Sequence, residues 1–445
     1  MTYNNPLNQD FGRRALIRFA LPTIVMMAVI STYSILDAIL LSRLVSTDSM
    51  AAANIAFPVS SFLMGMGLMF GRGGSALIAK QMGGGKEEEA CGIFSFLVMV
   101  AFVFGIITAL TGIFGSEQIS QYLGANDILL NDTSIYLRTL MVFAPFTLLQ
   151  LMFQSFYITA GHGRLGMILM IISGIVDAVL NIVFMGVLEM GIFGAALSTV
   201  IGHSISPIVG MVIFIKRRSG LRFLRPVFDM GALFKSCSNG ASELVTNMTG
   251  GVTTFLFNAV MMEYFKEAGV SAVSIITYSQ FFLSSVYIGF SSGVAAIFSF
   301  NLGADNHERI NRIFKECIRI IGAMSCFVTM LSFLLSGNIV GFFADNTDTV
   351  YSVALQGMRF LAISFLFTGI NTFVTIFFSA MSEGRIATTI SLFRKLVFLV
   401  IGITVFPKIL GENSVWMTIL SGEILTSVIC MFLLWKKMKK IKKSY

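Results

Sequence analysis

The sequence predicts an all-α polytopic membrane protein, with about twelve transmembrane helices in two six-helix lobes related by pseudo-twofold symmetry. Three observations lead to this fold class. Hydrophobic residues make up 56% of the 445 residues and charged residues only 12%, about half the charged share of an ordinary soluble protein. The hydrophobic residues gather in long segments, and the second half of the chain repeats patterns of the first.

The long apolar segments define the expected helices. At 1.5 Å per residue, a helix of roughly 20 residues crosses a hydrocarbon core of about 30 Å. In chain order, the expected spans are 15–42, 51–81, 91–114, 133–160, 164–186, 191–215, 233–264, 270–302, 312–336, 349–381, 385–407 and 413–435.

The charged residues between these segments predict the topology. Basic clusters such as "GRR", "KRRSGLRFLRP" and "KKMKKIKKSY" occur in alternate gaps, whereas gaps such as "STDSM" and "GENS" are neutral or acidic. The positive-inside rule then places both termini and the loop between the sixth and seventh segments in the cytoplasm. The net charge of +8 is explained by these loops, so we expect no nucleic-acid partner.

An internal repeat relates the two halves of the chain. "GRGGSALIAKQMGGG", from Gly71, aligns with "SSGVAAIFSFNLGAD", from Ser291, at an offset of 220. "SFYITAGHGR" and "IFFSAMSEGR" align at 221. Parallel repeats of this kind suit alternating access; a duplicated bundle without transport is the alternative, and charges inside the membrane argue against it. We expect an N-lobe at 1–215, a cytoplasmic linker at 216–232, a C-lobe at 233–435 and a basic cytoplasmic tail at 436–445.

The first expected helix carries a carboxylate, Asp37, in the apolar stretch "ISTYSILDAILL". A charge in such a segment is costly and usually faces a cavity; an acid that reaches water at the outer interface is the alternative. Tyr33 lies on the same helical face, four residues earlier. Pro22 removes one backbone hydrogen bond, so this helix can bend there.

The fifth expected helix carries Asp177, with Asn181 one turn later on the same face. With Asp37 they would form one site, which could change its protonation state or hold Na⁺. Polar contacts that only join helices are the alternative. Thr199, in the sixth helix, would add a hydroxyl or bond its own backbone.

The second half carries its own polar cluster of Glu243, Arg394 and Glu423. Arg394 and Glu423 lie at similar depths from the cytoplasmic ends of their helices, which lets them meet as a buried ion pair. Such a pair fixes geometry more than it adds stability, and its role in the transport cycle stays open. Arg72 is expected to snorkel to the inner face.

Enzyme chemistry finds no support in the sequence, so we expect no enzyme and no cofactor other than a coupling ion. P-loop and HExxH patterns are absent from the sequence, and the glycines of "GMGLMFG" do not follow a strand. The three histidines and five cysteines show no spacing typical of a zinc site or a disulfide framework.

With these residues, the chain resembles the multidrug and toxic compound extrusion (MATE) family. The resemblance rests on Pro22, Tyr33 and Asp37, and on "ALIAKQMGGGK", "TAGHGRLGM", "GIFGAALSTV" and "FNLGADN". "LFRK" followed by "SGEIL" is similar to the bacterial branch of the DinF and MepA type. The resemblance implies secondary-active export of organic cations and drugs against H⁺ or Na⁺, with the cation site at Asp37, Asp177, Asn181 and Thr199.

Two positions depart from the family pattern. Asp177 precedes Asn181, whereas many members have the reverse order; Gly250 occupies a position where the NorM branch has an acid.

From the residues and the resemblance together, we expect an antiporter that exports amphipathic, often cationic compounds in exchange for H⁺, or alternatively Na⁺ held by Asp37, Asp177 and Asn181. A lipid-linked oligosaccharide flippase of the same superfamily is the alternative. The expected partners are small organic substrates and membrane lipid, and we expect a monomer in the bacterial inner (cell) membrane.

Overall fold

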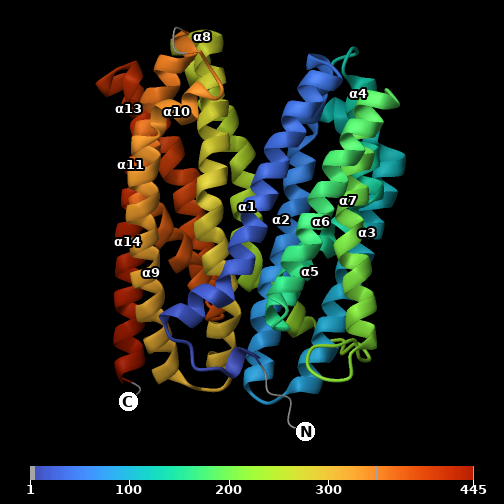
Figure 1. The fold of residues 1–445 in the computed structure, drawn as a ribbon, viewed down its shortest axis with the longest axis vertical. Coiled ribbons are helices and arrows are strands. Elements are labelled where there is room, and N and C mark those ends of the chain that lie inside the picture. Colours follow the sequence, from blue (N-terminus) through green and yellow to red (C-terminus); the bar gives the residue numbers. More distant parts are fainter. Residues whose placement is uncertain (1–5, 346–347, 444–445) are drawn as a thin grey trace.

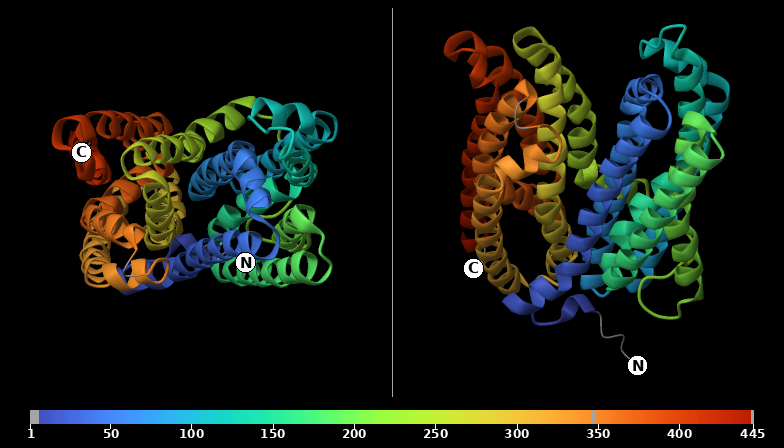
Figure 2. Two further views of the ribbon diagram at one scale, coloured as in Figure 1. Left: turned by 90° about the horizontal axis from the view of Figure 1, so that it is seen from above. Right: turned by 45° about the horizontal axis from the view of Figure 1, so that its top comes forward.

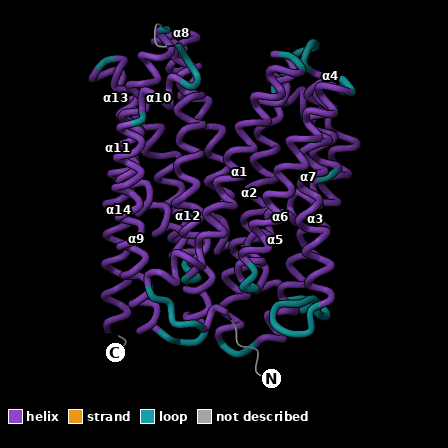
Figure 3. The backbone as a smooth tube through the Cα atoms, in the orientation of Figure 1, coloured by secondary structure: helices purple, strands orange, loops and turns teal. Residues whose placement is uncertain are grey.

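The structure, a computed structural model, describes residues 6–345 and 348–443. Within these ranges the chain is helical almost throughout and contains no strand (Figure 3). The predicted all-α class is therefore confirmed. Ten described helices are long and apolar enough to cross a membrane, and a bent pair of helices forms one more span.

The first half of the chain supplies the helices on one side of the molecule. The bent pair in this half corresponds to the fourth expected span, and its helices meet at 55° near Pro145, which cannot donate a backbone hydrogen bond. The elements are η1 (Pro6–Asn8), α1 (Arg13–Leu44), α2 (Thr47–Gly83), α3 (Glu87–Tyr122), α4 (Leu130–Val142), α5 (Ala144–Thr159), α6 (Gly163–Asn181), the π-helical turn η2 (Ile182–Val187) and α7 (Gly191–Lys216).

The second half supplies the helices on the other side. α8 (Met230–Gly303) makes two crossings, because its backbone leaves helical geometry at Lys266, where φ is 55°. Counted so, the spans match the twelve that the sequence predicts. The other elements are α9 (His307–Leu334), α10 (Ser336–Gly341), α11 (Thr349–Ala380), α12 (Gly384–Leu392), the π-helical turn η3 (Phe393–Val397), α13 (Phe398–Leu410), η4 (Glu412–Trp416) and α14 (Met417–Lys443).

The two groups of helices stand side by side with both chain ends at the same end of the molecule (Figure 1). Figure 2 shows that the groups approach each other near the chain ends and diverge toward the opposite end. α1 and α2 of the first half pack against α8 of the second. The division into lobes with the expected boundaries stays a proposal. α7 ends at Lys216 and α8 begins at Met230, on either side of the expected linker. The expected tail lies within α14, except for residues 444–445, which are outside the described part.

Two glycines form a reciprocal contact where α2 and α8 end. A Cβ atom on Gly83 would clash with the carbonyl of Phe300, and a Cβ atom on Gly303 would clash with the carbonyl of Lys80. Each residue of one contact is 220 positions from its counterpart in the other, which is the offset of the internal repeat. The contact is therefore symmetric, as expected at a pseudo-twofold axis, and only glycine allows the backbones to come this close.

Candidate functional site

In the first half, one amide joins two carboxylates. Asn181 donates from Nδ2 to Oδ1 of Asp37 at 2.8 Å and to Oδ1 of Asp177 at 3.3 Å. Asp37 lies on α1, whereas Asp177 and Asn181 lie one turn apart at the end of α6, just before η2. Asp177 and Asn181 are each only 2% exposed. The structure thus brings together the three residues that the sequence analysis expects to form a site.

α7 brings two adjacent hydroxyls, those of Ser198 and Thr199, to this site. Ser198 donates to Oδ1 of Asn181. Thr199 lies beside the Asp177 carboxylate, and its hydroxyl donates to its own backbone at Ala195 O over 3.1 Å. Sequence reasoning missed Ser198 because two adjacent hydroxyl residues differ only by about 100° of rotation around the helix. Ser198 fixes the orientation of the Asn181 amide, so that the NH₂ group faces the two carboxylates.

Tyr33 and Pro22 of α1 both lie against α6. The Tyr33 ring packs against Gly174 of α6, where an added Cβ would lie 3.2 Å from Cδ1 of the ring. Within the described part of the chain, the Tyr33 hydroxyl has no hydrogen bond to either carboxylate. Pro22 is buried near Gly163, at the start of α6.

The second carboxylate oxygen of Asp177 lacks a donor. Asp177 Oδ2 is buried and has no hydrogen-bond partner among the described residues, and the same holds for the hydroxyl of Ser173, four residues earlier. A buried polar atom without a partner is costly, and a charged oxygen more so. A proton or a bound cation at this oxygen would remove that cost, so the arrangement can take up positive charge.

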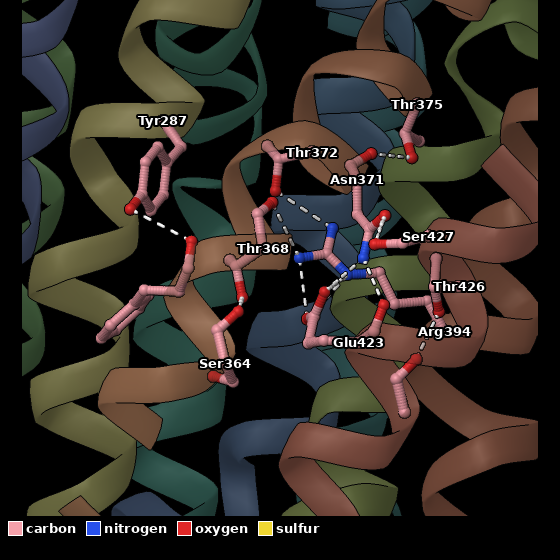
Figure 4. A network of polar contacts seen from close by, with 12 residues as sticks. Tyr287, Ser364, Thr368, Asn371, Thr372, Thr375, Arg394, Glu423, Thr426 and Ser427 are labelled. Atoms are coloured by element: carbon pink, nitrogen blue, oxygen red, sulfur yellow. Dashed lines mark hydrogen bonds and ion pairs between the residues drawn. The ribbon is translucent and has the colours of Figure 1, made fainter. Parts of the chain in front are cut away.

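The second half contains a fully bonded network around Arg394 and Glu423 (Figure 4). Arg394 Nε donates to Glu423 Oε1 at 2.9 Å and Oε2 at 3.1 Å, so the expected contact is present. Asn371 Nδ2 donates to Glu423 Oε2 at 2.7 Å, and Arg394 Nη1 donates to the Thr372 hydroxyl at 3.0 Å. Ser427 donates to Asn371 Oδ1 at 2.9 Å. Because every partner is satisfied, the network fixes the relative positions of η3, α11 and α14.

Glu243 does not join this network, which corrects two expectations. Glu243 of α8 pairs with Arg72 of α2, and the two side chains are only 14% and 15% exposed. Arg72 therefore does not snorkel to the inner face. The close approach of α2 and α8 explains this: a Cβ on Gly73 would clash with Ser236 O, and a Cβ on Gly240 would clash with Met69 O. The pair links the two halves of the chain.

A second set of contacts links the halves at the end that holds the termini. Arg13 of α1 donates to Glu316 of α9 at 2.8 Å, and Arg309 donates to the backbone oxygen of Asn8 at 3.0 Å. Arg312 forms an ion pair with Asp10. Arg13, Arg312 and Asp10 are more than half exposed, so each contact contributes little by itself, but together they tie the start of the chain to the second half.

The chain is similar to known proteins over most of its length. The model of the MatE family matches residues 22–183 and 244–404. The multidrug export protein MepA of Staphylococcus saprophyticus subsp. saprophyticus is 23% identical over 95% of this chain and 93% of its own length. MepA of Staphylococcus aureus strain MSSA476 is 24% identical over the same shares, 95% and 93%.

Solved structures share the fold along nearly the whole chain. The crystal structure of a MATE protein in complex with MaL6 has a TM-score of 0.93 at 19% identity and covers 100% of both chains. A MOP superfamily transporter from Pyrococcus furiosus, described as having a binding pocket of reverse polarity, has a TM-score of 0.89 at 20% identity, with 97% of this chain and 96% of that chain covered.

Proposed function

Because this chain belongs to the MatE family, we propose that it is a secondary-active multidrug antiporter that exports amphipathic, often cationic compounds in exchange for H⁺. The similarity to MepA multidrug export proteins supports the substrate class. The observation that carries the coupling mechanism is the pair of carboxylates, Asp37 and Asp177, held together by the amide of Asn181.

The carboxylate pair supplies the coupling in this proposal. Two acids that share one amide in a mostly buried site cannot both keep a negative charge at low cost, so binding of a proton is favoured. An organic cation that approaches the pair supplies the same positive charge, and proton and substrate then compete. Competition for one charge site gives antiport when the protein changes its open side only with one of the two occupants bound.

The orientation of the Asn181 amide favours H⁺ over Na⁺. Sodium prefers oxygen ligands, but Asn181 turns its NH₂ group toward Asp37 and Asp177, and its oxygen accepts from Ser198. A Na⁺ ion that takes the Asn181 carbonyl oxygen as a ligand would need this amide to rotate. A proton does not require this rotation. It can bind a carboxylate oxygen to which the Asn181 amide does not donate, while the amide keeps its present hydrogen bonds.

Alternating access would require the two halves to separate at the end that holds the termini. There the Gly83 and Gly303 contacts and the Arg13–Glu316 pair join the halves, and deeper in the molecule the Arg72–Glu243 pair does so. We assign this end to the cytoplasm of a bacterial cell by the positive-inside rule. With these contacts formed, the N-half acids would be accessible only from the outer side.

The alternative, a lipid-linked oligosaccharide flippase, is less well supported. Holding a pyrophosphate would need several cations that are free to contact it. Arg72 and Arg394 are each paired with a glutamate, so neither is free, and Lys395 beside Arg394 supplies one cation where a pyrophosphate needs several. The acids Asp37 and Asp177 would in addition repel an anionic headgroup.

Transport by the purified protein in liposomes tests the proposed function. Uptake of tetraphenylphosphonium, an amphipathic cation, would be followed under a pH gradient alone and under a Na⁺ gradient alone. We expect uphill transport with the pH gradient and none with the Na⁺ gradient. Transport driven by Na⁺ alone would overturn the coupling ion, and transport under neither gradient would overturn the antiport mechanism.

A further inference from the structure

A cavity in the second half has a charge opposite to that of the Asp37 site. Its volume is about 170 Å³, well above the roughly 10–15 Å³ that a single water needs. α8, η3, α13, η4 and α14 form its walls, and the charged residues that line it are Arg394, Lys395 and Glu423. Two cations and one anion leave a net charge of one positive unit in this cavity.

The positive charge that is not compensated belongs to Lys395. Glu423 is fully engaged with Arg394 and Asn371, and none of the described residues forms an ion pair or a hydrogen bond with the Lys395 ammonium. The π-helical turn η3 holds both basic residues, and the hydroxyl of Thr253 on α8 donates to the Lys395 carbonyl at 2.9 Å. This bond fixes the backbone at Lys395 against the cavity wall.

Trp416 closes one side of the same cavity. Trp416 is 1% exposed, and its indole Nε1 has no hydrogen-bond partner among the described residues. The ring is held in place on Gly357, where an added Cβ would lie 2.8 Å from two ring atoms, and it stacks with Phe257 at a centroid distance of 6.3 Å. Because its neighbours enclose Trp416, this residue shapes the apolar wall, and Lys395 is the donor without a partner that lines the cavity.

From this combination we infer that the cavity binds the carboxylate of an apolar monoanion, with Lys395 as its charge partner and with Phe257 and Trp416 in the wall beside its apolar part. One net positive charge matches one negative charge, and a dianion would leave an excess. An ammonium bonds a carboxylate more strongly than it bonds a neutral amide. If the bound carboxylate belongs to a transported substrate, the substrate range includes compounds with both a cationic and an anionic end. This role in transport rests on the proposed function, whereas binding of the carboxylate does not.

Three ligands that share a naphthalene ring system test the charge preference on the purified protein in detergent. They are 2-naphthoate, 2-naphthamide and 2-naphthylmethylammonium, with charges of minus one, zero and plus one. The chain has two tryptophans, so a Trp435→Phe variant leaves Trp416 as the only indole reporter, and its fluorescence follows binding. We expect naphthoate to bind about tenfold or more tightly than the amide. Equal affinity for the acid and the amide would overturn the inference.

Two variants then assign the preference to Lys395. Lys395→Gln should remove the preference for naphthoate, and Lys395→Arg should keep it. Lys408→Gln is the matched control, because this lysine is exposed on α13 near the same segment of chain. A naphthoate preference that persists in Lys395→Gln would also overturn the inference. Naphthoate binding is measured without a gradient, so a negative result does not affect the proposal of proton-driven export. In the same way, absence of tetraphenylphosphonium transport in liposomes does not affect the proposed binding of naphthoate.

Discussion

Arg72 on α2 and Glu243 on α8 form an ion pair that joins the two halves of the chain through largely buried side chains. Neither residue has another charged partner among the described ion pairs. The pair can form only while α2 and α8 are close together, so we consider it part of the contact that must open during transport.

Breaking the Arg72–Glu243 pair should destabilise the state with the halves joined. Arg72→Gln or Glu243→Gln leaves one charge without its partner, which costs about 3 kcal/mol at the low end of the range for buried pairs. We expect a lower melting temperature and slower export for each single variant. The double variant should recover much of the stability, and a double variant as unstable as the sum of the two would show that the side chains act independently.

The reciprocal glycine contact predicts a sensitivity that helix propensity alone does not. Gly83→Ala or Gly303→Ala should destabilise the protein and slow export, because the methyl group would clash with a backbone carbonyl of the other half. The control is Gly322→Ala on α9, where nothing lies within 4 Å of an added Cβ. There alanine should be neutral or stabilise by up to about 1 kcal/mol. Equal effects at all three positions, measured by thermal melts, would contradict the close approach.

A great part of this fold was predictable, whereas the partners of individual polar groups were less so. Hydropathy predicts the spans because each must satisfy its own backbone within the lipid. The repeat offset of 220 also predicts a symmetric arrangement, and the contact of Gly83 with Phe300 has its counterpart in the contact of Gly303 with Lys80. Depth along a helix suggested that Arg394 could reach Glu423, but depth alone says nothing of rotation or of neighbouring helices, and for this reason the Arg72–Glu243 pair was missed.

Neutral polar residues were missed for a different reason. Asn371 and Ser427 contribute to the Glu423 network, yet in the sequence each is one uncharged polar residue in an apolar segment. Such residues often bond their own helix, so the pattern gives no sign of a partner. The choice between Ser198 and Thr199 has the same origin, since both lie in the sequence "STV".

The Arg394–Glu423 pair should show strong energetic coupling. Removing either charge alone leaves the other buried and uncompensated, at a cost of about 3–5 kcal/mol. Removing both, as Arg394→Met with Glu423→Leu, should cost clearly less than the sum of the two single changes. A double-mutant cycle from thermal melts in detergent measures the coupling, and additive effects would contradict the contacts at 2.9 and 3.1 Å.

Ser198 should matter more for coupling than Thr199. Ser198→Ala removes the hydroxyl that bonds Asn181 Oδ1, so the amide loses the contact that fixes its orientation. Thr199→Val removes a bond to the helix backbone at Ala195 and leaves the bond between Ser198 and Asn181 in place. We expect Ser198→Ala to weaken proton-driven export several-fold, by the loss of about 1 kcal/mol for one hydrogen bond, and Thr199→Val to retain it. The reverse order would show that Thr199 provides the functional hydroxyl.

Proton release on substrate binding tests the central claim most directly, which is that Asp37 and Asp177 hold the proton that the substrate displaces. Tetraphenylphosphonium is added to the purified protein in weakly buffered detergent near neutral pH, and a pH indicator records released protons. We predict release from the wild-type protein and none from Asp37→Asn combined with Asp177→Asn. The control variant Glu412→Gln, which changes an exposed acid of η4, should release protons as the wild type does. Unchanged release from the double variant would contradict the account, because the displaced proton would then come from another group.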